Sequence, residues 1–175
     1  HIIDQFLKAI RPSQPRVEPT EINELVREAM RFLEPELNDR GVQLTLELHS
    51  ALPTLQLDPD QIKQAFYNVV KNATQATPPG GSIVVHSDLI DEYVTVSFTD
   101  SGEGISVDNM SNVFQPYFST KKSGTGLGLL IIRRIIREHG GEIEIASEEG
   151  KGAAVTLFLP RFSRSARLLP DSGNC

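Results

Sequence analysis

The sequence predicts an α/β (α+β) domain, and three observations lead to this fold class. Stretches with helical spacing of apolar residues are interleaved with stretches in which apolar and polar residues alternate, so helices and strands are both expected. Two pairs of neighbouring strands, 82–88 with 93–99 and 142–147 with 153–160, are each separated by a short turn. The 175 residues suffice for one domain with a sizeable core.

The first 19 residues are expected to precede this domain. Residues 1–10 have the apolar spacing of a helix that is too short to stand alone, and Pro12, Pro15 and Pro19 follow closely. We therefore interpret 1–10 as the C-terminal end of a preceding domain's last helix and 11–19 as a proline-rich linker. The chain starts inside an element, which predicts a fragment of a longer protein.

The domain itself is expected over residues 20–160 and begins with a helix. Thr20 and Glu21 suit a helix N-terminus, an apolar stripe follows, and Gly41 ends the segment. Residues 42–49 alternate between apolar and polar, which predicts a half-buried strand.

A second helix is predicted from Asp58-Pro59 to about Ala76, since proline is favoured in the first turn of a helix. The segment from Asp100 to about Gly126 is a long loop, and such loops inside compact domains are usually functional. A third helix, Leu127–His139, ends at two glycines and leads into the closing strand pair. The tail 161–175 has no periodicity and is expected to be mobile.

Composition excludes several classes of protein. The formal net charge of −6 argues against a nucleic-acid partner, because such proteins usually carry a basic surplus. The single cysteine, Cys175, cannot form an internal disulfide, so a cytoplasmic domain fits best. No apolar run approaches the ~20 residues that a membrane span needs, and the parent protein is expected to be either soluble or membrane-anchored.

The first motif that carries chemistry is Asn68-Val-Val-Lys-Asn72 on the second helix. Asn68 and Asn72 are four residues apart and share one helix face, rotated away from the apolar stripe. Amide oxygens suit a hard cation such as Mg²⁺. Taken alone, the pair is better explained as solvated surface asparagines.

The second motif is Asp100-Ser-Gly-Glu-Gly104, directly after a predicted strand. A buried carboxylate accepts hydrogen bonds from an exocyclic amine such as that of adenine, and the two glycines let the backbone approach a flat ring. The plain alternative is a turn, because these residue types favour turns.

The third motif is Gly124-Thr-Gly-Leu-Gly128, at the start of the third helix. Glycine-rich backbone at a helix N-terminus presents free N–H groups to phosphates. The spacing matches neither a Walker A loop nor a Rossmann fingerprint, and a flexible hinge is the alternative. Upstream, Phe114-Gln-Pro-Tyr-Phe118 can pin the long loop to the domain, and Lys121 and Lys122 can reach a phosphate as point charges.

The order and spacing of these motifs resemble the N, G1, F and G2 boxes of bacterial two-component sensor histidine kinases. The resemblance covers about residues 20–160, and Phe6-Leu7, Arg11-Pro12 and Gln75-Ala76 are similar to nitrogen-regulation-type sensors. It implies the Bergerat ATP-binding fold, a two-layer sandwich in which helices cover one face of a mixed sheet.

The resemblance also implies a site that binds ATP and Mg²⁺. Asn72 would ligate Mg²⁺, Asp100 would bind the adenine amine, and residues from about 105 to 125 would be the ATP lid. The full set of ATP-binding residues implied is Asn68, Lys71, Asn72, Asp100, Gly102, Gly104, Ile105, Lys121, Gly124, Thr125, Gly126, Leu127 and Gly128. The closing strand departs from many relatives at Gly152-Ala-Ala-Val155, a change expected to affect packing and not chemistry.

Within this superfamily, gyrase-type, chaperone and mismatch-repair ATPases place a glutamate where this chain has Asn68. A neutral amide cannot act as a general base toward water, so transfer is favoured over hydrolysis. The implied partners are the protein's own dimerisation and phosphoacceptor domain and a response regulator, in a homodimeric parent. A nucleotide-sensing module without transfer activity is the alternative. His1 is not expected to be the acceptor, because Ile2 and Ile3 follow it directly where the family has an acidic residue, and the linker comes soon after.

Overall fold

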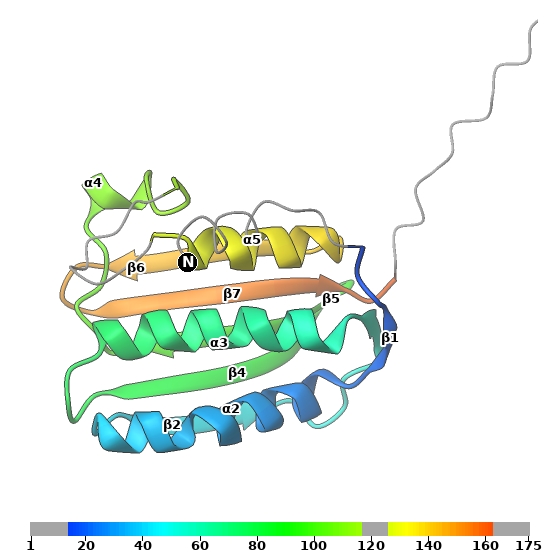
Figure 1. The fold of residues 1–175 in the computed structure, drawn as a ribbon, viewed down its shortest axis with the longest axis horizontal. Coiled ribbons are helices and arrows are strands. Elements are labelled where there is room, and N and C mark those ends of the chain that lie inside the picture. The colour runs from blue at the N-terminus through cyan, green and yellow to red at the C-terminus, as the bar shows by residue number, and fades with distance from the viewer. Residues whose placement is uncertain (1–13, 117–125, 163–175) are drawn as a thin grey trace, which may run out of the picture.

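The computed structural model describes residues 14–116 and 126–162 (Figure 1). The predicted helix over 1–10, the first three residues of the predicted linker and nearly all of the tail therefore lie outside the described residues. The elements, in chain order, are β1 (Glu18–Thr20), α2 (Ile22–Asp39), β2 (Gln43–Leu48), β3 (Leu55–Leu57), α3 (Pro59–Ala76), β4 (Ser82–Ile90), β5 (Tyr93–Asp100), α4 (Val107–Met110), α5 (Gly128–Glu138), β6 (Glu142–Glu148) and β7 (Gly152–Pro160).

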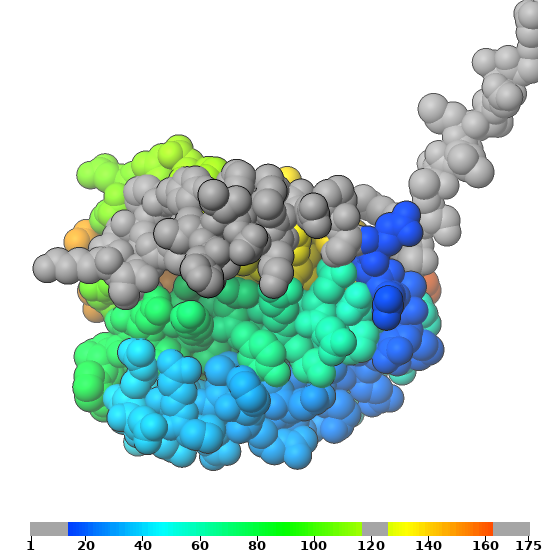
Figure 2. All heavy atoms as spheres, in the orientation of Figure 1, coloured from blue at the N-terminus to red at the C-terminus, as the bar shows by residue number. Residues whose placement is uncertain are grey.

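The main sheet is mixed, as expected for the two-layer sandwich. Its five strands have the order β2-β4-β5-β7-β6, in which β2 and β4 are parallel and every other neighbouring pair is antiparallel. The long helices α2, α3 and α5 lie side by side on one face of this sheet (Figure 1), and Figure 2 shows the α2 and α3 segments as neighbours on the surface. The predicted fold class is thus confirmed.

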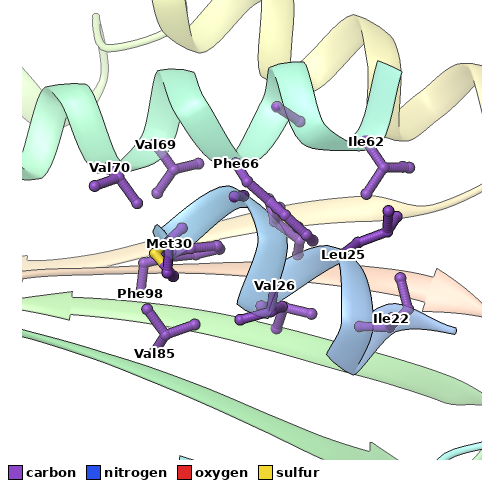
Figure 3. Packing of buried hydrophobic residues seen from close by; sticks show 14 of the residues in the cluster. Ile22, Leu25, Val26, Met30, Ile62, Phe66, Val69, Val70, Val85 and Phe98 are labelled. Atoms are coloured by element: carbon purple, nitrogen blue, oxygen red, sulfur yellow. The ribbon is translucent and has the colours of Figure 1, made fainter. Parts of the chain in front are cut away.

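The core fills the space between the helices and the sheet. Side chains from α2 and α3 interlock above β4 and β5, and the Phe66 and Phe98 rings pack with their centroids 5.5 Å apart (Figure 3). Every residue of the stripe predicted for α3 is buried, namely Ile62, Phe66, Val69 and Ala73. Burial of this apolar face is the main stabilising contribution to α3, because an isolated helix of this length is marginal in water.

Three short elements were not predicted. Strands β1 and β3 pair antiparallel with Glu18 opposite Leu57, outside the main sheet, and α4 lies within the long loop. Of the two residues predicted at the helix N-terminus, Glu21 is the N-cap of α2, which begins at Ile22, whereas Thr20 is the last residue of β1. Segments of three or four residues have too little periodicity for sequence patterns to detect, and strand pairing across the chain decides them.

No helix within 14–116 and 126–162 is long and apolar enough to cross a membrane. The remaining boundaries agree with the sequence to within two residues, including the left-handed Gly41 after α2, which has φ of +67°. The left-handed conformation suits glycine because a Cβ would be strained there.

Asp58 caps the N-terminus of α3. Its Oδ1 accepts a hydrogen bond of 3.1 Å from the backbone N–H of Gln61, and Oδ2 accepts one of 2.8 Å from the backbone N–H of Arg16. Burial raises the pKa of this carboxyl, but the backbone N–H groups of Arg16, Gln61 and Asp60, together with His139, outweigh burial and hold the pKa below its ordinary value of 3.8.

Asp58→Ala is expected to lower the free energy of unfolding by about 1–2 kcal/mol, because the cap is lost. Asp58→Asn keeps a capping oxygen and is expected to cost less. Since the folded carboxyl has the lowered pKa, its contribution is complete above pH 3.8 and is lost as the pH falls through the lowered value. Urea unfolding from pH 7 to pH 2.5 should show the wild type converging on Asp58→Asn; a gap that is constant with pH would contradict the role of the charge.

Candidate functional site

Helix α3 presents the two asparagines toward α5. Their positions lie off the buried stripe, as predicted, and both side chains are half-buried. The Asn68 amide nitrogen donates a hydrogen bond of 2.8 Å to the backbone oxygen of Gln64, so the Asn68 side chain is held against its own helix. This bond directs the amide oxygen of Asn68 away from that helix turn.

The N-terminus of α5 meets these asparagines at Gly128. A Cβ placed on Gly128 would lie 3.3 and 3.4 Å from the two amide atoms of Asn72 and 3.7 Å from Oδ1 of Asn68. A side chain here would make a tight contact with the Asn72 amide, so glycine lets the two helices approach closely. Because the first N–H groups of a helix have no partner within it, backbone donors and amide oxygens converge at this point.

The backbone before α5 is anchored by a buried leucine. Gly126 has φ of +66°, a left-handed conformation, and the Leu127 side chain is 2% exposed. Of the predicted phosphate-binding residues, Gly128 thus lies beside the asparagines, and Gly126 and Leu127 directly precede it in the chain. Lys121, Gly124 and Thr125 lie outside the described residues.

Asp100 ends β5 and is only 7% exposed. Its Oδ1 accepts hydrogen bonds from the backbone N–H groups of Gly102, at 2.8 Å, and Ala153, at 3.3 Å. The loop after β5 and the start of β7 therefore both orient this carboxylate. The contribution of Ala153 was not predicted, because a backbone donor has no signature in the sequence.

Gly102 and Gly104 lie so close to the backbone of neighbouring segments that a side chain would not fit at either position. A Cβ on Gly102 would lie 2.5 Å from the Ala76 oxygen, and one on Gly104 would collide with the Glu148 oxygen. Gly104 also has φ of +71°. The glycines let the chain after Asp100 pack between the end of α3 and the β6–β7 turn.

Ile105, the last residue expected in this part of the site, is held by the sheet. Its backbone N–H donates a hydrogen bond of 2.8 Å to Oγ of Ser147, which in turn donates to the Gly152 oxygen at 2.8 Å. Ser147 and Gly152 were not predicted as site residues. The glycines around Lys151 were the only signal in the sequence.

The described part of the long loop is pinned to α5. The Arg133 guanidinium lies over the Phe114 ring, 4.8 Å from its centroid, and Val113 is buried. Phe114 was expected to pin this loop, whereas Arg133 was not predicted. A cation over an aromatic face contributes about 0.5–1 kcal/mol at an exposed site.

Two lysines of α3, Lys63 and Lys71, differ in their surroundings. Lys71 is exposed on α3. A hydrogen bond from Lys63 to Glu28 raises the pKa of Lys63, against the opposing effect of its partial burial. This pair links α3 to α2. Within the described residues, no group of three or more His, Cys, Asp and Glu side chains suits a metal ion. A cation beside Asn68 and Asn72 would depend on amide and ligand oxygens, a donor set that suits Mg²⁺ bound with phosphates.

Fold and site together define a nucleotide-binding domain built on a mixed sheet, with a buried carboxylate at the end of β5 and amides of α3 facing a glycine-rich helix start. The chain belongs to the histidine kinase-, DNA gyrase B- and HSP90-like ATPase family, whose model matches residues 57–163.

Individual relatives narrow this assignment to histidine kinases. The sensor histidine kinase ZraS of Escherichia coli (strain K12) is 37% identical over 159 residues, which cover 91% of this chain and 34% of ZraS. The catalytic domain of histidine kinase ThkA is 33% identical with a TM-score of 0.76, covering 83% of this chain and 96% of that domain. A complex of ThkA with the response regulator TrrA has a TM-score of 0.80 at 28% identity, covering 94% of this chain and 47% of the ThkA chain. The chain thus spans about a third of the length of ZraS.

Proposed function

We propose that this domain binds ATP·Mg²⁺ between α3, α5 and the segment of about 105–125, and presents the γ-phosphoryl group to a histidine on the dimerisation domain of a homodimeric parent protein. The phosphoryl group then passes to an aspartate of a response regulator. The observation that carries the proposal is the convergence of the Asn68 and Asn72 amides on Gly128 at the start of α5. The ThkA–TrrA complex supports the regulator as partner.

Each described group has a defined part in this proposal. The Asp100 carboxylate accepts from the adenine amine, the Asn72 oxygen holds Mg²⁺, and the N–H groups at Gly126 to Gly128 bind phosphate oxygens. Mg²⁺ neutralises charge on the phosphates when it is bound. Catalysis then consists of positioning and electrostatic stabilisation, as is usual for phosphoryl transfer.

The transfer step needs no base from this domain. A neutral imidazole nitrogen attacks the γ-phosphorus, the bond to the β–γ bridging oxygen breaks, and ADP leaves with that electron pair. Attack by water would need a general base, and Asn68 is a neutral amide where related hydrolases have a glutamate. The atoms nearest to the Cβ position of Gly128 are amide atoms of Asn72 and Asn68, and neutral amides favour transfer over hydrolysis.

The 175-residue chain is expected to bind ATP·Mg²⁺ at one site in calorimetry, to hydrolyse it very slowly and to form no stable phosphoprotein. Adding the dimerisation hairpin of the parent protein should produce acid-labile, base-stable radiolabel on the hairpin. A hairpin whose phosphoacceptor histidine is replaced by alanine is the matched control. Label on His1, or fast steady-state hydrolysis by the chain alone, would contradict the proposal, and binding without any transfer to the hairpin would leave a nucleotide-sensing module.

A further inference from the structure

Both carboxylate oxygens and both backbone polar groups of Asp58 form hydrogen bonds, at a point where three segments distant in the sequence meet. Besides the two carboxylate bonds to Arg16 and Gln61, its backbone oxygen accepts from Ile62 at 3.0 Å. Its own backbone N–H donates to Nε2 of His139 at 3.0 Å. The bonds to Arg16 and His139 span 42 and 81 residues of sequence, which is more than helix capping requires.

His139 completes this junction from the end of α5. Its Nδ1 lies 2.7 Å from the Ile135 oxygen, which can only accept, so Nδ1 carries the proton and Nε2 is the acceptor for Asp58. The left-handed Gly140, with φ of +75°, turns the chain away directly afterwards. The imidazole is therefore fixed at both nitrogens. We refer to Arg16, Asp58 and His139 as the clasp.

The clasp lies at the opposite end of α3 and α5 from the nucleotide site. Helix α3 starts at the clasp and carries Asn68 about 15 Å further along its axis, by the usual rise per residue. Helix α5 runs the other way, from Gly128 beside the asparagines to His139. The two helices thus meet at the clasp and again at the asparagines beside Gly128. The hydrogen bond of Arg16 is made at the clasp.

We propose that Asp58 and His139 are positioning residues, which couple the chain entering the domain at Arg16 to the spacing of α3 and α5 at the nucleotide site. The proposal rests on the proposed function. Helices are stiff and the core between them is close-packed, so displacement at one end is passed along them. If Arg16 moves away, the buried Asp58 carboxylate loses a hydrogen-bond donor, which costs free energy. The start of α3 is therefore expected to move together with Arg16.

Arg16→Pro tests this coupling because proline removes the backbone N–H and leaves Asp58 in place. Arg16→Ala is the matched control, since it removes the side chain and keeps the N–H. Arg16→Pro is expected to weaken ADP·Mg²⁺ binding in calorimetry about fivefold or more, a typical coupling between sites. It should also shift the side-chain amide NMR signals of Asn68 and Asn72, and Arg16→Ala should do neither.

Coupling is reciprocal, so ADP·Mg²⁺ should slow hydrogen exchange at the backbone N–H groups of Arg16 and Asp58 by a similar factor. His139→Leu should reproduce the effect of Arg16→Pro, and His139→Gln, whose oxygen takes the place of Nε2, should rescue it. The coupling would be contradicted if Arg16→Pro and Arg16→Ala bound ADP·Mg²⁺ within twofold of each other and the Asn68 and Asn72 signals did not change. That result would leave the proposed function intact. Failure of the wild-type chain to bind ADP·Mg²⁺ would instead overturn the proposed function, and this inference with it.

Discussion

Asp100→Asn is expected to weaken ATP binding about 10- to 100-fold while the domain stays folded. The new amide keeps an oxygen for the backbone N–H groups of Gly102 and Ala153, which now bind Oδ1. Its nitrogen is a donor, however, and would face the donating amine of adenine. An unmatched buried polar pair costs about 1–3 kcal/mol, and each 1.4 kcal/mol is a factor of ten in affinity.

Asp100→Ala removes the acceptor altogether. Comparing it with Asp100→Asn distinguishes the effect on ATP binding from the effect on stability. It should weaken ATP as strongly as Asp100→Asn, but it also leaves two backbone donors without their acceptor, so its melting temperature should fall further. Calorimetry with ATP and GTP, beside thermal melts, checks both variants. If the wild type binds GTP as tightly as ATP, the adenine role of Asp100 is wrong.

Gly152→Ala is expected to lower the free energy of unfolding by about 3–4 kcal/mol. Few mechanisms cause so large a loss, and backbone strain and overpacking are two of them. Gly152 has φ of +94°, and a Cβ there would collide with the backbone oxygen of Asp100. Backbone cannot rotate aside as a side chain does, so the start of β7 must move away from β5. That movement would break the bond from Ala153 to Asp100, and ATP affinity should fall as well.

Gly150→Ala is the matched control, two residues earlier in the same turn. Gly150 has φ of +82°, but nothing lies within 4 Å of the Cβ position. Only the left-handed strain of about 1–2 kcal/mol is expected, with ATP affinity unchanged. Urea unfolding and calorimetry distinguish the two variants, and equal destabilisation by both would show that the contact with Asp100 is unimportant.

The long elements could be predicted from the sequence because each has a strong local signal. Helix α3 has a cap at Asp58, proline in its first turn and a complete apolar stripe, so its start and buried face were both correct. Gly41 and Gly140 marked two helix ends correctly, because each adopts a left-handed conformation. Strands β1 and β3 lacked any such signal, since a three-residue strand exists only through its partner.

The part of the candidate site that consists of side chains and motif glycines could be predicted from the sequence. Asn68, Asn72 and Asp100 were identified from residue type and spacing, and their roles in nucleotide binding remain predictions. Backbone partners could not be found in this way, as the N–H of Ala153 illustrates. Every residue has such a donor, so only the folded chain reveals which one points at a carboxylate.

By itself, the sequence determined the order of the long elements, the buried face of α3 and the motif series that matches a family, because these depend on local spacing and residue chemistry. The tertiary structure alone decided that Gly128 faces Asn72, that Gly152 lies against Asp100, and that His139 bonds to Asp58. The residues in each of these pairs are separated by more than 50 positions, and they meet only because burial of the common apolar core brings α3, α5 and the ends of β5 and β7 together.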